Sequence, residues 1–75
     1  MKKYKNYKFD DYKVGDLIKN LAHDDDYIGM IIEKNGNICN QRNQHRGLIK
    51  IFYHDFKIKD YVFELDRDYI FLEIL

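Results

Sequence analysis

The sequence predicts a small all-β domain made of five short strands. Apolar and polar side chains alternate with a period of two through 47–53, 58–65 and 70–75, which is the pattern of half-buried strands. No stretch shows a helical period longer than one turn. A chain of 75 residues has room for one domain with a thin core.

Two glycine-containing stretches near the N-terminus indicate the first two strands, at about 16–21 and 27–34. Gly15 and Gly29 are expected where the chain bends sharply or where another backbone passes close. The Asn-Gly dipeptide at 35–36 readily accepts positive φ at both turn positions. We therefore predict a turn there, at the end of the second strand.

The stretch 35–46 is mostly polar or glycine, which favours a protruding loop or a hairpin tip. Whether 37–41 pairs back as a short edge strand is open at this point. The third strand, 47–53, follows, and both of its faces are partly apolar. One face carries Ile49, Ile51 and Tyr53, and the other carries Leu48, Lys50 and Phe52.

A turn at 54–57 leads into the fourth strand, 58–65, where alternation places Tyr61, Phe63 and Leu65 on one face. Residues 65–69 are too few for an α-helix and fit a short 3₁₀ turn before the last strand. That strand, 70–75, has Ile70, Leu72 and Ile74 on the expected inner face and Phe71, Glu73 and Leu75 on the other.

Residues 1–12 form an N-terminal extension to the domain, which we place at 13–75. The extension is rich in Lys, and its aromatic residues are Tyr4, Tyr7, Phe9 and Tyr12. Because these side chains favour contact with other apolar groups, we expect the extension to be held in place. It would either lie back along the domain or be fixed by a partner chain.

Composition excludes several classes of function. The 13 basic and 13 acidic residues give no net charge, so no global basic excess attracts phosphate backbones. Cys39 is the only cysteine and cannot form an intrachain disulfide. No apolar run is long enough to span a membrane. We expect a soluble, cytoplasmic protein.

Candidate chemistry is sparse. His23 and the acidic residues 24–26 could hold a hard cation, but the ligand spacing of a calcium-binding loop is missing, and a solvated loop is expected. The glycines lack the spacing of a phosphate-binding loop. Cys39 with a histidine could form a nucleophile and base, yet so small a domain lacks room for the rest of a catalytic site. We predict no cofactor, no metal and no enzymatic activity.

The order of these parts resembles a known family. It combines Gly-Asp-Leu-Ile at 15–18, Tyr-Ile-Gly-Met-Ile-Ile at 27–32, a polar loop, an aromatic third strand and a short turn before the last strand. This order is similar to small SH3-like barrels, above all KOW-type and short phage-encoded ones that begin with Val-Gly-Asp-Leu. The resemblance covers about 13–75. It implies a five-stranded barrel and a phage accessory or virion component, in the host cytoplasm or the virion. Trp is absent and the peptide-binding SH3 signature is only loosely matched, so polyproline binding is not implied.

Surplus apolar surface is the main functional signal. A five-stranded barrel has one interior, so part of the apolar set must face outward, and such patches mark contact sites. We predict a non-enzymatic protein-interaction module that docks on a larger protein or assembles with itself. The predicted interface residues are Phe52, Tyr61, Phe63, Phe71 and Leu75.

The alternative function is binding of nucleic acid by a small barrel with a basic polar loop at 41–50. Arg, Asn and Gln side chains contact phosphates and base edges. The residues for this role are Lys34, Arg42, Asn43, Arg46 and Lys50. Because the net charge is zero and the flanking segments are acid-rich, attraction to phosphate is weakened, and protein docking is the preferred interpretation.

Overall fold

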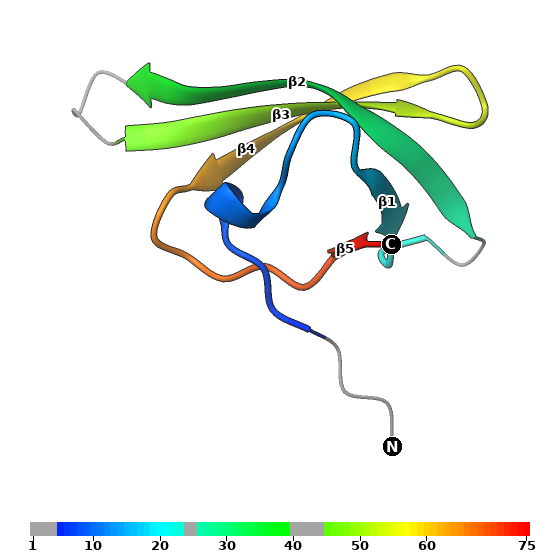
Figure 1. Cartoon of the computed structure of the whole chain (residues 1–75), viewed down its shortest axis with the longest axis horizontal. Coiled ribbons are helices and arrows are strands. Elements are labelled where there is room, and N and C mark those ends of the chain that lie inside the picture. Colours follow the sequence, from blue (N-terminus) through cyan, green and yellow to red (C-terminus); the bar gives the residue numbers. More distant parts are fainter. Residues whose placement is uncertain (1–4, 24–25, 40–44) are drawn as a thin grey trace.

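The structure, a computed structural model, describes residues 5–23, 26–39 and 45–75, without the side chains of 37–39. It is mostly β, with a five-stranded antiparallel sheet and a one-turn 3₁₀ helix (Figure 1). The strands are β1 (Leu17–Asn20), β2 (Tyr27–Cys39), β3 (His45–Tyr53), β4 (Ile58–Glu64) and β5 (Leu72–Ile74), and the 3₁₀ helix η1 is Phe9–Asp11. The predicted all-β class with five strands is confirmed.

The strands follow the order β4-β3-β2-β1-β5 across the sheet. The first four strands pair antiparallel with their neighbours in the chain, and β5 returns to pair with β1. The last strand therefore lies beside the first. Within the described residues no ladder joins β4 to β5, so the sheet is open between these two strands.

The predicted turn at 35–36 is wrong, because β2 continues through these residues to Cys39. Asn35 pairs with Leu48, and after a change of register the ladder resumes with Ile38 opposite Arg46. A bulge absorbs extra residues in this way without ending the strand. Gly36 is not among the described residues with positive φ. β2 and β3 are instead the two arms of a hairpin, and 40–44 between them lie outside the described residues.

The 3₁₀ turn predicted at 65–69 is also wrong. The described 3₁₀ helix lies at Phe9–Asp11, and 65–69 form an irregular turn that ends in an isolated bridge. In that bridge, Tyr69 exchanges backbone hydrogen bonds with Tyr7, at 2.8 and 2.7 Å. A single turn hydrogen bond, from the Arg67 N–H to the Glu64 carbonyl at 3.3 Å, precedes the bridge. Pairing with Tyr7 requires extended backbone at Tyr69, so the turn does not continue into a 3₁₀ helix.

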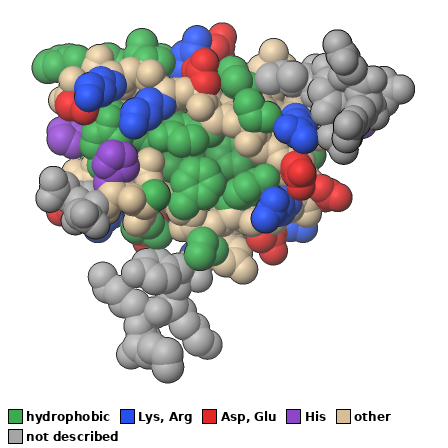
Figure 2. Space-filling model, turned by 180° about the vertical axis from the view of Figure 1, so that it is seen from behind, with side chains coloured by type: hydrophobic (Ala, Val, Ile, Leu, Met, Phe, Trp, Pro, Cys, Tyr) green, Lys and Arg blue, Asp and Glu red, His purple; other side chains and the backbone are tan. Residues whose placement is uncertain are grey.

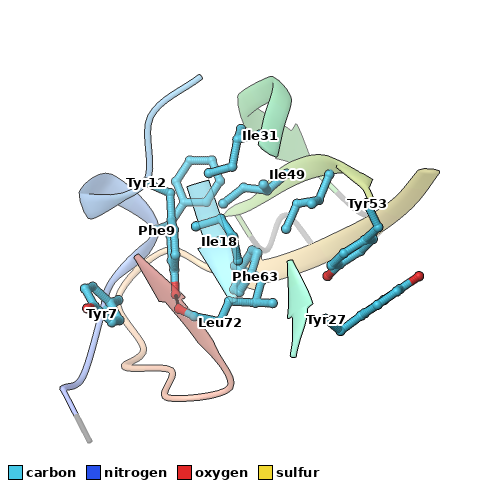
Figure 3. Close-up of a cluster of buried hydrophobic side chains, with 11 residues drawn as sticks. Tyr7, Phe9, Tyr12, Ile18, Tyr27, Ile31, Ile49, Tyr53, Phe63 and Leu72 are labelled. Atoms are coloured by element: carbon cyan, nitrogen blue, oxygen red, sulfur yellow. Dashed lines mark hydrogen bonds between the residues drawn. The ribbon is translucent and has the colours of Figure 1, made fainter. Parts of the chain in front are cut away.

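The core lies on one side of the sheet, which we call the inner side (Figure 3). Ile49, Ile51 and Tyr53 of β3 are fully buried there, on one face as predicted. Other strands add the buried side chains of Ile18, Tyr27, Ile31, Phe63 and Leu72.

Residues 7–12 of the N-terminal extension cover this core. Tyr7, Phe9 and Tyr12 are buried within the same cluster as the strand residues. The Tyr12 hydroxyl donates to the Leu72 carbonyl at 2.7 Å, which links the extension to β5. The described part of the extension thus lies back along the sheet, one of the two arrangements expected, and Tyr4 lies outside the described residues.

The two glycines at the start of the sheet have the roles that the sequence predicts. Gly15 has a φ of +96° in the turn before β1, a conformation that glycine adopts without a steric penalty. Gly29 of β2 lies so close to β3 that a Cβ would be 2.6 Å from Ile51 Cγ2 and 2.8 Å from the Phe52 carbonyl oxygen. A side chain at position 29 would therefore force the two strands apart.

Phe9 occupies a place that a glycine of β3 keeps open. A Cβ on Gly47 would overlap three carbons of the Phe9 ring, whereas a Cβ on Gly36 would remain 3.5 Å from the nearest ring atom. Lys34 holds the same segment from β2. Its Nζ lies 4.6 Å from the centroid of the Phe9 ring and donates to the Tyr12 carbonyl at 2.6 Å.

Gly47→Ala is expected to lower the free energy of unfolding by about 1–3 kcal/mol, the usual cost of overpacking a core. Urea denaturation measures this change. Gly36→Ala is the matched control and should cost less than about 1 kcal/mol, because its Cβ makes an ordinary contact. In a Phe9→Ala background the cost of Gly47→Ala should vanish, and a cost that persists would contradict this role of Phe9.

A buried polar cluster links three strands beside the core. Asn20 of β1 is 4% exposed, and its Nδ2 donates to the hydroxyls of Tyr53 and Tyr61 at 3.2 and 3.1 Å. The two hydroxyls lie 2.6 Å apart, within hydrogen-bonding distance. Asn20 Oδ1 accepts from the Ala22 backbone N–H at 2.9 Å. Both polar atoms of this buried amide are therefore satisfied, as buried polar groups normally are.

Asn20→Ala should lower the free energy of unfolding by about 1–3 kcal/mol, because two hydroxyls inside the sheet lose their donor. The same substitution at Asn6, which is exposed, should change it by less than about 0.5 kcal/mol. Equal costs for the two variants in chemical denaturation would show that the cluster adds nothing to stability.

Candidate interaction surface

The outer side of the sheet carries a row of apolar residues that crosses every strand. Register places Leu17 opposite Met30, Met30 opposite Phe52, and Phe52 opposite Ile58. Leu75 follows β5 and donates its backbone N–H to the Leu17 carbonyl at 2.9 Å, which adds it to the end of the row. We call these five residues the outer row. At the usual strand spacing the row spans roughly 19 Å.

All five residues of the outer row are exposed. The exposed fractions are 59% for Leu75, 52% for Leu17, 41% for Met30, 36% for Phe52 and 54% for Ile58. Successive side chains of a strand point to opposite faces, and Leu17, Met30 and Phe52 each adjoin a buried residue, so these three face outward. Ile58 and Leu75 lie opposite Phe52 and Leu17 and therefore share their face. Contiguous apolar patches of this kind mark contact sites.

Phe56 extends the outer row at the turn between β3 and β4. Its side chain is 83% exposed, and its ring centroid lies 6.1 Å from that of Phe52. Its φ is 66°, in the left-handed region that bulky residues rarely adopt. A left-handed backbone at a bulky residue costs conformational free energy, and the ring that this turn presents lies mostly in solvent.

Tyr27 fixes this turn to the core. Its ring stacks on Tyr53, with centroids 4.0 Å apart, and its hydroxyl lies 3.1 Å from each carboxylate oxygen of Asp55. Burial and the hydrogen bond to Asp55 raise the pKa of Tyr27. Desolvation alone would raise the pKa of Asp55, but hydrogen bonds from the Lys57 backbone and the Tyr27 hydroxyl lower it below the usual value. The Asp55 carboxylate thus fixes the turn that presents Phe56, because it accepts hydrogen bonds both from Tyr27 and from the backbone of Lys57.

A shallow hollow lies beside the outer row. It measures about 240 Å³ and is almost entirely apolar. Its lining residues come from the first three strands and the start of the β3–β4 turn: Leu17, Ile28, Gly29, Met30, Phe52, Tyr53 and His54. The surface beside the outer row is therefore indented and can receive a side chain.

Charged residues form the next row of the same face. Lys50 of β3 lies between Glu33 of β2 and Asp60 of β4 in the register. Its Nζ is 3.3 Å from Glu33 Oε2. Across the outer row, Lys19 pairs with Asp26 at 3.1 Å. The apolar row is thus bordered on both sides by charges of mixed sign.

The structure separates the five predicted interface residues. Phe52 and Leu75 belong to the outer row. Tyr61 and Phe71 are half-buried at the opening between β4 and β5, where their ring centroids lie 5.8 Å apart. Phe63 is fully buried beneath them, so its prediction as an interface residue is wrong. The face of β4 that carries it is the inner one, because the N-terminal aromatics pack on that side.

A second apolar hollow lies where the chain leaves β1 and enters β5. It is lined by Leu21, Ala22, Ile70 and Phe71. Ile70 is 51% exposed and precedes β5, so its predicted inward orientation is wrong, whereas that of Leu72 is confirmed. Figure 2 shows hydrophobic side chains gathered in the middle of the face turned away in Figure 1, with charged side chains around them.

The basic residues of the alternative function do not form one described cluster. Lys34 contacts Phe9 and Tyr12 on the inner side, and Lys50 pairs with Glu33 on the outer side. Arg46 is half-buried on β3, opposite Glu64. Arg42 and Asn43 lie outside the described residues. The two lysines are therefore directed to opposite sides of the sheet.

No other candidate site emerges from the described part of the chain. Within 5–23, 26–39 and 45–75, no three His, Cys, Asp or Glu side chains gather as a metal site would require. His23 packs against Tyr27, with ring centroids 4.2 Å apart. Asp24, Asp25 and the Cys39 side chain lie outside the described residues. Among the helices described, none has the length and apolar character to cross a membrane.

No protein-family model matches this chain, and neither the curated proteins nor the solved structures show a match to it.

Sequence reasoning missed four residues of this surface: Leu17, Met30, Phe56 and Ile58. Leu17, Met30 and Ile58 are ordinary strand residues, and only the register shows that they align with Phe52. The signal available for Phe56 was its place in a predicted turn, where a large apolar residue is unusual.

Tyr27→Phe is expected to raise the pKa of Asp55 toward its ordinary value of 3.8, because one of the donors to the carboxylate is removed. Since the pKa in the folded protein is lowered, the carboxylate stabilises the turn above about pH 4 and this contribution is lost as the pH falls through the folded pKa. An NMR titration of the Asp55 carboxyl carbon measures the shift. Tyr61→Phe is the control and should leave the pKa of Asp55 unchanged. If Tyr27→Phe also leaves that pKa unchanged, the hydrogen bond from Tyr27 does not hold the Asp55 carboxylate.

Proposed function

We propose that this protein is a non-enzymatic protein-interaction module that binds its partner through the outer row and Phe56. The observation that carries the proposal is the alignment of five exposed apolar side chains across all strands of the sheet. Such a surface is costly in water and gains free energy when a partner covers it.

Three further features support this function. Aromatic and Met side chains are enriched in protein interfaces, and the surface holds Phe52, Phe56 and Met30. Charged residues border the apolar row, as the polar rim of an interface does. The hydrogen bond between Tyr27 and Asp55 holds the turn that presents Phe56, and a turn held before binding loses less conformational entropy when a partner binds.

The SH3-like barrel assignment and the role as a phage accessory or virion component remain proposals that rest on the resemblance of residues 13–75. The order of the strands, with β5 returning to β1, is compatible with that assignment. Binding of nucleic acid is the weaker alternative, because Lys34 and Lys50 are engaged within the fold and face opposite sides of the sheet.

Site-specific photo-crosslinking in the native cells tests the proposed function. A benzophenone amino acid at Phe52 should give a covalent adduct with a protein of defined mass. The matched control is the same residue at Asp10, which is exposed on η1 at the inner side. Adducts of equal yield at both positions, or none at Phe52, would show that the outer row is not a binding surface.

A further inference from the structure

We propose that the partner of the outer row is a second copy of this chain, in a dimer whose two-fold axis runs parallel to the strands between β2 and β3. This proposal rests on the proposed function and names its partner. In such a dimer the outer sides of the two sheets face each other. Met30 then lies against Phe52 of the other copy, and Leu17 lies against Ile58.

The exposed area is sufficient for a stable dimer. With about 200 Å² for a fully exposed large side chain, the four outer-row residues that this axis covers (Leu17, Met30, Phe52 and Ile58) and Phe56 expose roughly 500 Å² of apolar surface. An interface of standard size buries about 800 Å² on each partner, of which somewhat more than half is apolar. The apolar part of such an interface is therefore already present on one face of the monomer.

The charges beside the outer row match this axis. Glu33 and Lys50 sit at the same level on β2 and β3, and both are partly exposed. A rotation about an axis between these two strands exchanges their positions. Glu33 of one copy then faces Lys50 of the other, and the reverse pair forms by symmetry, so opposite charges meet twice.

Other two-fold arrangements of the same face bring Glu33 and Lys50 against like charges or against groups that cannot pair with them. With the axis directly over β2, Glu33 would face its own copy, and like charges would repel. With the axis across the strands, Glu33 and Lys50 would lie against Ile28 and His54 of the partner, so charges would be desolvated by apolar or basic groups. The axis between β2 and β3 is the one that the charges favour.

Phe56 completes the fit. The rotation carries the β3–β4 turn of one copy over β1 and β2 of the other, where the hollow lined by Leu17, Ile28 and Met30 lies. Each exposed Phe56 ring then faces the hollow of its partner. Aromatic side chains seated in such pockets are the residues that contribute most to binding. In the dimer, the left-handed backbone at Phe56 directs its ring toward the partner.

Charge reversal tests the dimer directly. The wild-type chain should sediment at twice its mass of 9.2 kDa, whereas Glu33→Lys and Lys50→Glu should each weaken association at least tenfold. Mixing these two variants should restore association. The lysine introduced at position 33 of one copy then faces the glutamate introduced at position 50 of the other, and the native Glu33 and Lys50 form the second pair. Native mass spectrometry with one variant labelled with ¹⁵N identifies the mixed dimer.

The same reversal at a distant ion pair is the control. Lys8 and Asp68 lie 4.0 Å apart on the N-terminal extension and the 65–69 turn, away from the outer row. Lys8→Glu and Asp68→Lys should therefore dimerise like the wild type. Circular dichroism and urea denaturation of each variant verify that it is folded.

Phe56→Ser offers a second, independent variant. It should weaken the dimer by roughly 100-fold, in the range of interface hot spots, and leave the free energy of unfolding of the monomer nearly unchanged. Variants of Glu33 and Lys50 that dimerise alone, or that fail to associate when mixed, would overturn the second copy as partner. If the crosslinker at Phe52 still captures a different protein in that case, the proposed function stands and only its partner is wrong.

Discussion

The described aromatic residues of the N-terminal extension, at 7, 9 and 12, pack on one side of the sheet, and the exposure of the other side follows from this. Tyr7, Phe9 and Tyr12 make the inner side of the five strands into a core. Within the described residues, the outer side lacks an equivalent covering segment, so its apolar residues are left in contact with water. A chain of this size has too little material to cover both sides of a curved sheet.

The local sequence pattern predicted the strands well. It did not predict the turns at 35–36 and 65–69 correctly, because these depend on pairing between segments far apart in the chain. The alternation of Ile49, Ile51 and Tyr53 identified the inner face of β3, since a period of two requires no knowledge of the neighbours. The Asn-Gly dipeptide at 35–36 failed as a turn signal, because β2 gains more hydrogen bonds by remaining paired with β3 than a tight turn would supply. The 3₁₀ turn near 65–69 failed for a similar reason, because the bridge to Tyr7 requires extended backbone at Tyr69, where the helical turn would have to end.

The existence of surplus apolar surface was predictable, but its position was not. Counting apolar residues shows that one interior cannot hold them all, and Phe52 and Leu75 are indeed exposed. The prediction for Phe63 is wrong because the sequence does not show which face of β4 the N-terminal aromatics cover. The outer row exists only through register, since its five members come from five different strands or strand ends and are far apart in the chain.

The bridge between Tyr7 and Tyr69, and the hydrogen bond from Tyr12 to Leu72, tie the N-terminal extension to the last strand and the segment before it. Contacts of such large sequence separation require closure of nearly the whole chain, which slows folding. During synthesis, the aromatic residues of the extension can make these contacts only after β5 has left the ribosome. The inner face of β1–β4 therefore stays open to chaperones and to aggregation until β5 has been made.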